Sequence, residues 1–160
     1  MIKRISALLL MAGILLLSGC SAAKTTEPAT AEETAEKVLQ CLYRSTQEDG
    51  ARLDAAMQEG EDSLKEYIRT KVGDCVTEEA VACIMENRLI SRVINAWPDT
   101  EVQVETVELT PAYTETEQEC YFQYQVEAGP EGETGKTFTG EVALSLIDEE
   151  WKVDLSLIHI

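Results

Sequence analysis

The stretch ECYFQYQV, residues 119–126, decides the fold that this sequence predicts. Every second position carries a side chain suited to a buried face: Cys120, Phe122, Tyr124 and Val126. This period of two is typical of a strand with one face in the core. The stretch FTGEVALSL, residues 138–146, repeats the alternation in Phe138, Gly140, Val142, Leu144 and Leu146. Two such stretches joined by a glycine-containing loop at residues 129–135 predict an antiparallel hairpin.

Two further strands flank this hairpin. The apolar positions of residues 102–109 change parity near Glu105 and Thr106, which predicts a bulge that bends a long strand. After a tight turn at residues 148–150, Trp151 and Val153 begin the last strand. The four strands therefore predict a curved antiparallel meander with one dry face and one wet face.

Residues 30–96 show helical spacing instead. Thr30 and Glu33 form a capping-box pattern that opens a first helix, which ends at residues 47–50. Three further helical pieces are predicted at residues 51–57, at residues 62–71, and from Thr77 with a possible continuation to Ala96. Helices followed by strands predict an α+β domain over residues 30–154, in which the N-terminal helices pack on the curved sheet.

The N-terminus has the layout of an export signal. Lys3 and Arg4 precede an apolar run over residues 5–17, which is too short to remain as a membrane span. The tetrapeptide LSGC that ends at Cys20 resembles the lipobox of bacterial lipoproteins, in which the cysteine receives a diacylglyceryl group with acyl chains such as palmitate. We therefore expect residues 1–19 to be a signal peptide and residues 20–29 a lipidated flexible tether. The lipid on Cys20 would hold the domain at the extracytoplasmic face of the cell membrane. An ordinary signal peptide with an incidental cysteine is the alternative.

The C-terminal segment 155–160 is interpreted as a non-native tail. Its sequence LSLIHI resembles the translation of a transposase adapter used in sequencing libraries. A natural apolar final strand is the alternative interpretation. The interpretation matters because His159 is the only histidine of the chain.

The charge of the chain excludes some partners. There are 30 acidic and 13 basic residues, and the net charge is −17. Loss of residues 1–19 would remove Lys3 and Arg4 and make the net charge −19. We therefore expect no nucleic-acid partner, because nucleic-acid binding depends on a basic surface. Anionic lipid would repel the domain, so only the lipid anchor is expected to touch the membrane.

The order of elements resembles a known superfamily. Short helices before a bulged four-stranded meander, a glycine inside a core strand and the final Trp151-Lys152-Val153-Asp154 are similar to the nuclear-transport-factor-2-like (NTF2-like) superfamily. The resemblance covers residues 30–154 and is strongest with lipoproteins whose cone-shaped domains have no known function. A cystatin-like fold with a single helix is the nearest alternative, but it leaves residues 51–96 unexplained.

The resemblance also raises the question of catalysis. Some enzymes of this superfamily use a carboxylate as general base inside the cone, with a tyrosine that stabilises an enolate. The two inward rows of this sequence contain Tyr124 but no carboxylate, because Glu119, Glu127 and Glu141 have the opposite parity. We therefore predict that the protein is not an enzyme and that Tyr124 is a core residue.

The remaining cysteines do not predict a metal site. Cys41, Cys75, Cys83 and Cys120 form no Cys-x-x-Cys pair, so we expect neither a metal nor a cofactor. They are either free thiols packed as small apolar residues or disulfides, with Cys75–Cys83 and Cys41–Cys120 as the most plausible pairing. The redox state stays open at this stage.

Binding is the function that these observations favour. The leading hypothesis is a non-enzymatic lipoprotein that binds a small apolar ligand, a peptide or an envelope protein at Tyr124, Phe122, Phe138 and Leu144. The alternative is a structural or assembly module of an envelope complex that forms a homodimer. Its interface would be the outer face of the sheet, with Tyr121, Gln123, Gln125 and Thr139. An isomerase or hydrolase acting on a small substrate is the third hypothesis.

Overall fold

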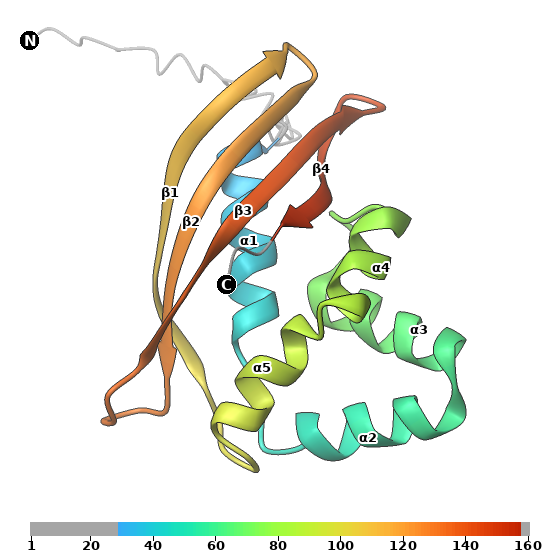
Figure 1. The fold of residues 1–160 in the computed structure, drawn as a ribbon, viewed down its shortest axis with the longest axis vertical. Helices are drawn as coiled ribbons and strands as arrows, with labels where there is room; N and C mark the ends of the chain where they lie inside the picture. Colours follow the sequence, from blue (N-terminus) through green and yellow to red (C-terminus); the bar gives the residue numbers. More distant parts are fainter. Residues whose placement is uncertain (1–28, 158–160) are drawn as a thin grey trace, which may run out of the picture.

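The computed structural model describes residues 29–157, except for the side chains of residues 113–115 and 155–157. The described chain begins with five helices: α1 (Ala31–Tyr43), α2 (Asp49–Glu59), α3 (Glu61–Val72), α4 (Glu78–Glu86) and α5 (Leu89–Ala96). Four strands follow: β1 (Gln103–Thr116), β2 (Glu119–Gly129), β3 (Lys136–Ile147) and β4 (Glu150–Leu157). The helices lie on one side of a curved sheet, with α1 against it (Figure 1). The predicted α+β fold is confirmed.

The sheet is an antiparallel meander with the strand order β1-β2-β3-β4. In β2 the predicted inward row is buried, with Phe122 8%, Tyr124 3% and Val126 0% exposed. In β3 the row continues with Val142 and Leu144, each 1% exposed. The parity that the sequence predicts for the two central strands is therefore confirmed.

The predicted bulge in the first strand is also present. Val104 pairs with Ala128 and Thr106 with Glu127, so Glu105 is the extra residue. At the other end of the sheet, Asp148 and Glu149 both have positive φ, 51° and 67°, in the two-residue turn that joins β3 to β4. Positive φ at both central positions matches the right-handed twist of a hairpin.

The two edges of the sheet differ. Along β4, the segment Cys75–Thr77 covers the edge, because Val153 N–H donates to the carbonyl oxygen of Cys75 and Thr77 N–H donates to that of Val153. Along β1, the described residues form only one bridge on the outer side, between Ser45 and Val102, just before the strand begins. The sheet is therefore closed at β4 and open at β1 within residues 29–157.

The capping box at the start of α1 is confirmed in atomic detail. Glu33 N–H donates to Thr30 Oγ1 at 3.2 Å, and Thr30 N–H donates to Glu33 Oε2 at 2.8 Å. The apolar face of α1 then contacts all four strands, with Val38, Leu39 and Leu42 at most 2% exposed. This helix is the centre of the core.

The helix opened by Thr77 does not continue to Ala96. It ends at Glu86, and α5 begins at Leu89 after Arg88 adopts a left-handed conformation with φ 51° and ψ 41°. Asn87 stabilises the end, because its side-chain amide donates to the carbonyl oxygen of Cys83. The apolar spacing runs on through the break, which is why the periodicity allowed a continuation to Ala96. The break redirects α5, whose Leu89 and Val93 are buried.

Several predictions fall outside the described residues. The signal peptide at 1–19, the lipidated Cys20, the tether as far as residue 28 and His159 are among them. The backbone of residues 155–157 forms the end of β4 and pairs with Glu141, Val142 and Ala143. The division into signal, tether, domain and tail stays a prediction. No helix within residues 29–157 has the length and apolar character needed to cross a bilayer.

Candidate binding surfaces

The four residues predicted to line a binding site lie together, but most of their surface is in the core. Tyr124, Phe122 and Leu144 are 3%, 8% and 1% exposed, and Phe138 is half-buried. The ring of Phe138 lies 4.8 Å from that of Tyr43, measured between centroids. A shallow cavity touches this group through Tyr124. The prediction that these residues bind a ligand stays a prediction.

A buried tyrosine pair holds this aromatic cluster together. The hydroxyl groups of Tyr43 and Tyr124 are hydrogen-bonded at 2.8 Å. Burial, followed by the charge and hydrogen bond of Tyr124, raises the pKa of Tyr43 far above its ordinary value. Tyr43 therefore stays protonated, and its hydroxyl serves the hydrogen bond with Tyr124.

Gly140 makes room for the ring of Tyr124. The two residues are cross-strand partners, and a Cβ atom at Gly140 would lie 2.6 Å from the hydroxyl oxygen of Tyr124. No side chain fits there unless the ring moves. The glycine inside the core strand, which was part of the family resemblance, is thus required by the tyrosine across from it.

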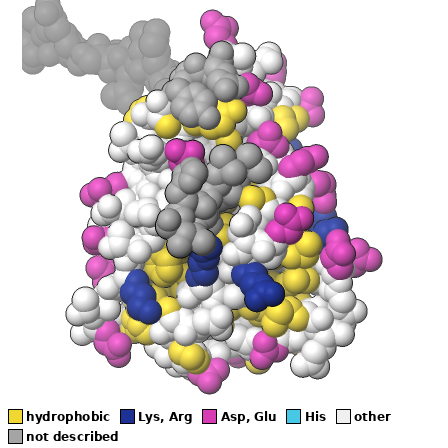
Figure 2. Space-filling view, viewed as in Figure 1, with side chains coloured by type: hydrophobic (Ala, Val, Ile, Leu, Met, Phe, Trp, Pro, Cys, Tyr) yellow, Lys and Arg dark blue, Asp and Glu magenta, His cyan; other side chains and the backbone are white. Residues whose placement is uncertain are grey.

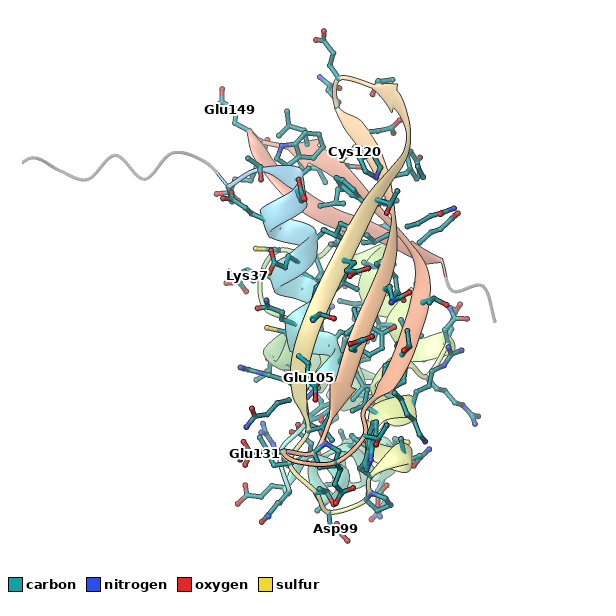
Figure 3. The ribbon with its side chains drawn as sticks, turned by 90° about the vertical axis from the view of Figure 1, so that its left-hand side faces the viewer. Lys37, Asp99, Glu105, Cys120, Glu131 and Glu149 are labelled. Atoms are coloured by element: carbon teal, nitrogen blue, oxygen red, sulfur yellow. The ribbon has the colours of Figure 1, made fainter. Side chains whose placement is uncertain are left out.

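The outer face of the sheet is polar and open. Gln123, Gln125 and Thr139 are exposed, and Tyr121 is half-buried. They surround or adjoin a shallow depression of about 350 Å³ that also includes the acidic residues Glu108 and Glu141. Figure 3 turns this face, with β1, β2 and β3, toward the viewer. The prediction that two copies meet through this face stays a prediction.

A larger groove lies in the helical layer, and we call it the α2/α5 groove. Its volume is about 780 Å³, and its apolar walls come from α2, α3, α4 and α5. The apolar lining includes Leu53, Met57, Leu64, Met85, Ile90 and Ile94. Met57 is 50% exposed, and it is one of two large apolar side chains that are exposed in the described residues. On the face shown in Figure 2, hydrophobic side chains gather in the lower half, where Figure 1 places these helices.

A second cavity, which we call the Asp49 pocket, has a different character. It has a volume of about 680 Å³ and lies where the C-terminal ends of α1 and α3 meet the starts of α2 and β1. Its polar lining includes Arg44, Asp49, Arg52, Tyr67, Lys71 and Glu101. The side chains of Lys71 and Asp49 are only 9% and 7% exposed, and Lys71 Nζ lies 2.8 Å from Asp49 Oδ2.

Asp49 is held as a carboxylate. Burial raises the pKa of Asp49, but hydrogen bonds from Lys71 and from Thr46 N–H, with the charges of Lys71 and Arg52, outweigh burial, so this pKa lies below its ordinary value. Lys71 Nζ donates a second hydrogen bond to the carbonyl oxygen of Arg44 at 2.8 Å. The ion pair is therefore held by hydrogen bonds on both partners, and Asp49 stays ionised at neutral pH.

The sequence does not predict this ion pair. Asp49 and Gly50 were expected at the end of the first helix, whereas Asp49 is the first residue of α2. Its partner Lys71 is 22 residues away, at the end of α3. No local spacing connects the two residues, so only the packing of α1, α2 and α3 shows that they meet.

The four cysteines among residues 29–157 are reduced thiols in this structure. Cys41, Cys75, Cys83 and Cys120 are all half-buried and form no disulfide. Burial raises the pKa of Cys120, which makes its thiol less reactive. Within the described residues, no group of three or more histidine, cysteine, aspartate or glutamate side chains could hold a metal ion.

Comparisons with known proteins give only remote likenesses. No protein-family model matches the chain, and no curated protein shows significant similarity to it. A periplasmic fragment of TraM superposes with a TM-score of 0.48 at 12% identity, over 81% of this chain and 96% of that chain. CagV, a VirB8 homolog of the T4SS from Helicobacter pylori strain 26695, gives a TM-score of 0.42 at 10% identity, over 79% of this chain and 95% of that chain. At these values neither likeness assigns a function to this chain.

Proposed function

We propose that this chain is a lipid-anchored, extracytoplasmic module that binds a protein partner in an envelope assembly and is not an enzyme. The observation that carries the proposal is the α2/α5 groove, a concavity with a mixed apolar and polar lining that includes the exposed Met57. Exposed apolar grooves with polar rims are typical of interaction sites. Methionine side chains such as Met57 and Met85 suit such a role, because they adapt to the surface that packs on them.

The chemistry of the groove favours a basic amphipathic helix as its occupant. An apolar groove between helices accepts the apolar face of another helix. Asp54 and Asp99 lie on the groove, and Arg88 is the only cationic residue that lines it. The chain as a whole has a net charge of −17, so a basic partner is attracted and an acidic one is repelled.

The position of the groove agrees with an anchor at Cys20. The N-terminal end of α1 lies at the end of the molecule where β1 and β2 join, and α2 and α5 lie at the opposite end (Figure 1). A tether that leads into α1 would therefore hold the groove away from the membrane. A partner in the extracytoplasmic space could then reach the groove without competing with lipid.

A small apolar ligand at the predicted aromatic site is the less favoured function. Tyr124, Phe122 and Leu144 are at most 8% exposed, and the ring of Tyr124 already fills the space beside Gly140. Such a ligand would have to displace this packing before it could bind. Catalysis is less favoured still, because the most buried carboxylate, Asp49, has a lowered pKa and is paired with Lys71.

The groove can be tested with a defined peptide. The probe is an 18-residue amphipathic helix of leucine and lysine, and the control is a scrambled peptide of the same composition. In ¹H–¹⁵N NMR titrations of residues 29–157, we expect saturable shifts in α2, α3 and α5 with the probe alone. Met57→Gln should weaken binding about tenfold, as expected when an apolar contact of about 1.4 kcal/mol is lost.

A matched control separates the groove from general charge attraction. Ala55→Gln makes the same kind of change at an exposed position of α2 that does not line the groove. It should leave the affinity unchanged. Equal binding of the scrambled peptide, or equal loss in both variants, would overturn the proposal.

The anchor needs a separate experiment. Cys20→Ser in the chain that begins at Met1 should abolish lipid attachment and move the protein out of the membrane fraction. Mass spectrometry of the N-terminal peptide gives the readout. Unchanged processing and membrane retention in the variant would refute the anchor and leave the groove proposal standing.

A further inference from the structure

The Asp49 pocket has more cationic than anionic side chains in its lining, whereas the chain as a whole is acidic. The sequence has 30 acidic residues against 13 basic ones. The pocket is lined by three cations, Arg44, Arg52 and Lys71, and by two carboxylates, Asp49 and Glu101. A concentration of cationic side chains in a concave site of an acidic protein attracts anions to that site.

Stability does not explain why a lysine is buried here. Removing Lys71 and Asp49 from water costs more than an apolar pair of similar size would, so a buried ion pair is weak evidence of stabilisation. The geometry instead holds the ammonium group still, because Lys71 Nζ donates to Asp49 Oδ2 and to the carbonyl oxygen of Arg44. An ammonium group has three donors, so one remains for a ligand.

The two arginines leave positive charge available at the mouth of the pocket. Asp49 is shared between Lys71, at 2.8 Å, and Arg52, whose Nη1 lies 3.9 Å from Oδ1. The exposed side chain of Arg44 has no hydrogen bond or ion pair within residues 29–157. Guanidinium groups bind carboxylate and phosphate through two parallel hydrogen bonds.

The pocket also offers an apolar wall and neutral donors. The ring of Tyr67 lies below Arg52, whose Cζ is 5.8 Å from the ring centroid. The hydroxyl-bearing Thr46 and Thr70 lie in the same lining. A volume of about 680 Å³ is in the range of small-molecule sites.

We propose that the Asp49 pocket binds a small anion through a carboxylate or phosphate group, with Arg44, Arg52 and Lys71 as its cationic contacts. This site is separate from the α2/α5 groove. It does not depend on the peptide partner proposed above.

The test uses succinate and inorganic phosphate as probes, at constant ionic strength with chloride as the reference. In NMR titrations we expect saturable shifts at the amides of Thr46 and Thr70 and at the Arg44 and Arg52 side chains. Arg44→Gln and Arg52→Gln should each weaken binding about fivefold to tenfold. Binding of only one probe would assign the group that the site prefers.

Lys37→Gln is the matched control. It removes one positive charge at an exposed position that lies outside both the Asp49 pocket and the α2/α5 groove. Its effect on affinity should be less than twofold. Shifts no larger than those with chloride, or equal losses in all three variants, would overturn the proposal. Lys71 is left intact because its removal is expected to destabilise the fold, which would confuse a loss of binding with a loss of structure.

Discussion

Two buried polar pairs can be compared in this molecule. Tyr43 and Tyr124 share a hydrogen bond of 2.8 Å between α1 and the sheet, surrounded by the core. Asp49 and Lys71 form an ion pair of the same length, also 2.8 Å, but in the wall of a cavity. The neutral pair tolerates complete enclosure, whereas a charged pair costs several kcal/mol per ion to desolvate. The comparison shows that the buried polar pair next to the sheet serves packing. The buried charged pair lies in the helical layer, where it faces a cavity.

The largest loss of stability is expected when one partner of the Asp49–Lys71 ion pair is removed. Lys71→Met leaves the Asp49 carboxylate buried without its partner, and we expect a loss of about 3–5 kcal/mol in the free energy of unfolding. Urea unfolding followed by circular dichroism measures this loss. The double variant Asp49→Leu/Lys71→Met should recover most of it. A double variant as unstable as the single one would show that the pair itself stabilises the fold.

A smaller loss of stability is expected when the space beside the ring of Tyr124 is reduced. Gly140→Ala places a Cβ atom 2.6 Å from the Tyr124 hydroxyl oxygen, and the ring has to move. Overpacking of this kind costs about 1–3 kcal/mol. In a Tyr124→Leu background the same substitution should cost clearly less, by the same unfolding measurement. Equal costs in both backgrounds would mean that the ring is not what requires the glycine.

Removing only the hydrogen bond should cost less again. Tyr43→Phe keeps the ring and deletes the hydroxyl bonded to Tyr124, so we expect a loss of about 1 kcal/mol. Tyr67→Phe serves as a comparison, because its hydroxyl makes a longer hydrogen bond of 3.4 Å to the carbonyl oxygen of Asp49. It should destabilise the protein less. The opposite ranking would contradict the importance given to the tyrosine pair.

The smallest effect comes from pH, and its sign distinguishes the two pairs. The pKa of Asp49 is lowered on folding, so its contribution is complete above the ordinary value of about 4 and is lost as pH falls through the lowered value. The pKa of Tyr43 is raised, so its contribution is complete below about pH 10 and falls above it. The stability difference between the original chain and Asp49→Asn should therefore shrink below about pH 4. A difference that stays constant down to pH 2 would contradict this assignment.

Local pattern predicted most of the sheet and little of the cavities. Three features of the fold depend only on neighbouring residues, and all three are confirmed. They are the alternation around Phe122 and Tyr124, the bulge at Glu105 and the capping box at Thr30. The break at Arg88 was missed because apolar spacing runs through it.

The Asp49–Lys71 pair was missed for a different reason. Its two members meet only after three helices have packed, so no short stretch of sequence carries the information. The same holds for the α2/α5 groove, whose walls come from four helices. The two cavities for which we propose a function are thus the parts that depend on long-range packing.

The uneven edges of the sheet limit how copies of this protein can associate by strand pairing. Within the described residues, backbone groups are available along β1, whereas the segment Cys75–Thr77 occupies the side of β4 around Val153. Two molecules that joined through β1 would each use up the open edge, and a third would find no strand to extend. Pro111, which has no N–H, and the bulge at Glu105 further weaken even this contact. Strand pairing at the open edge therefore favours a pair of molecules over a growing fibre.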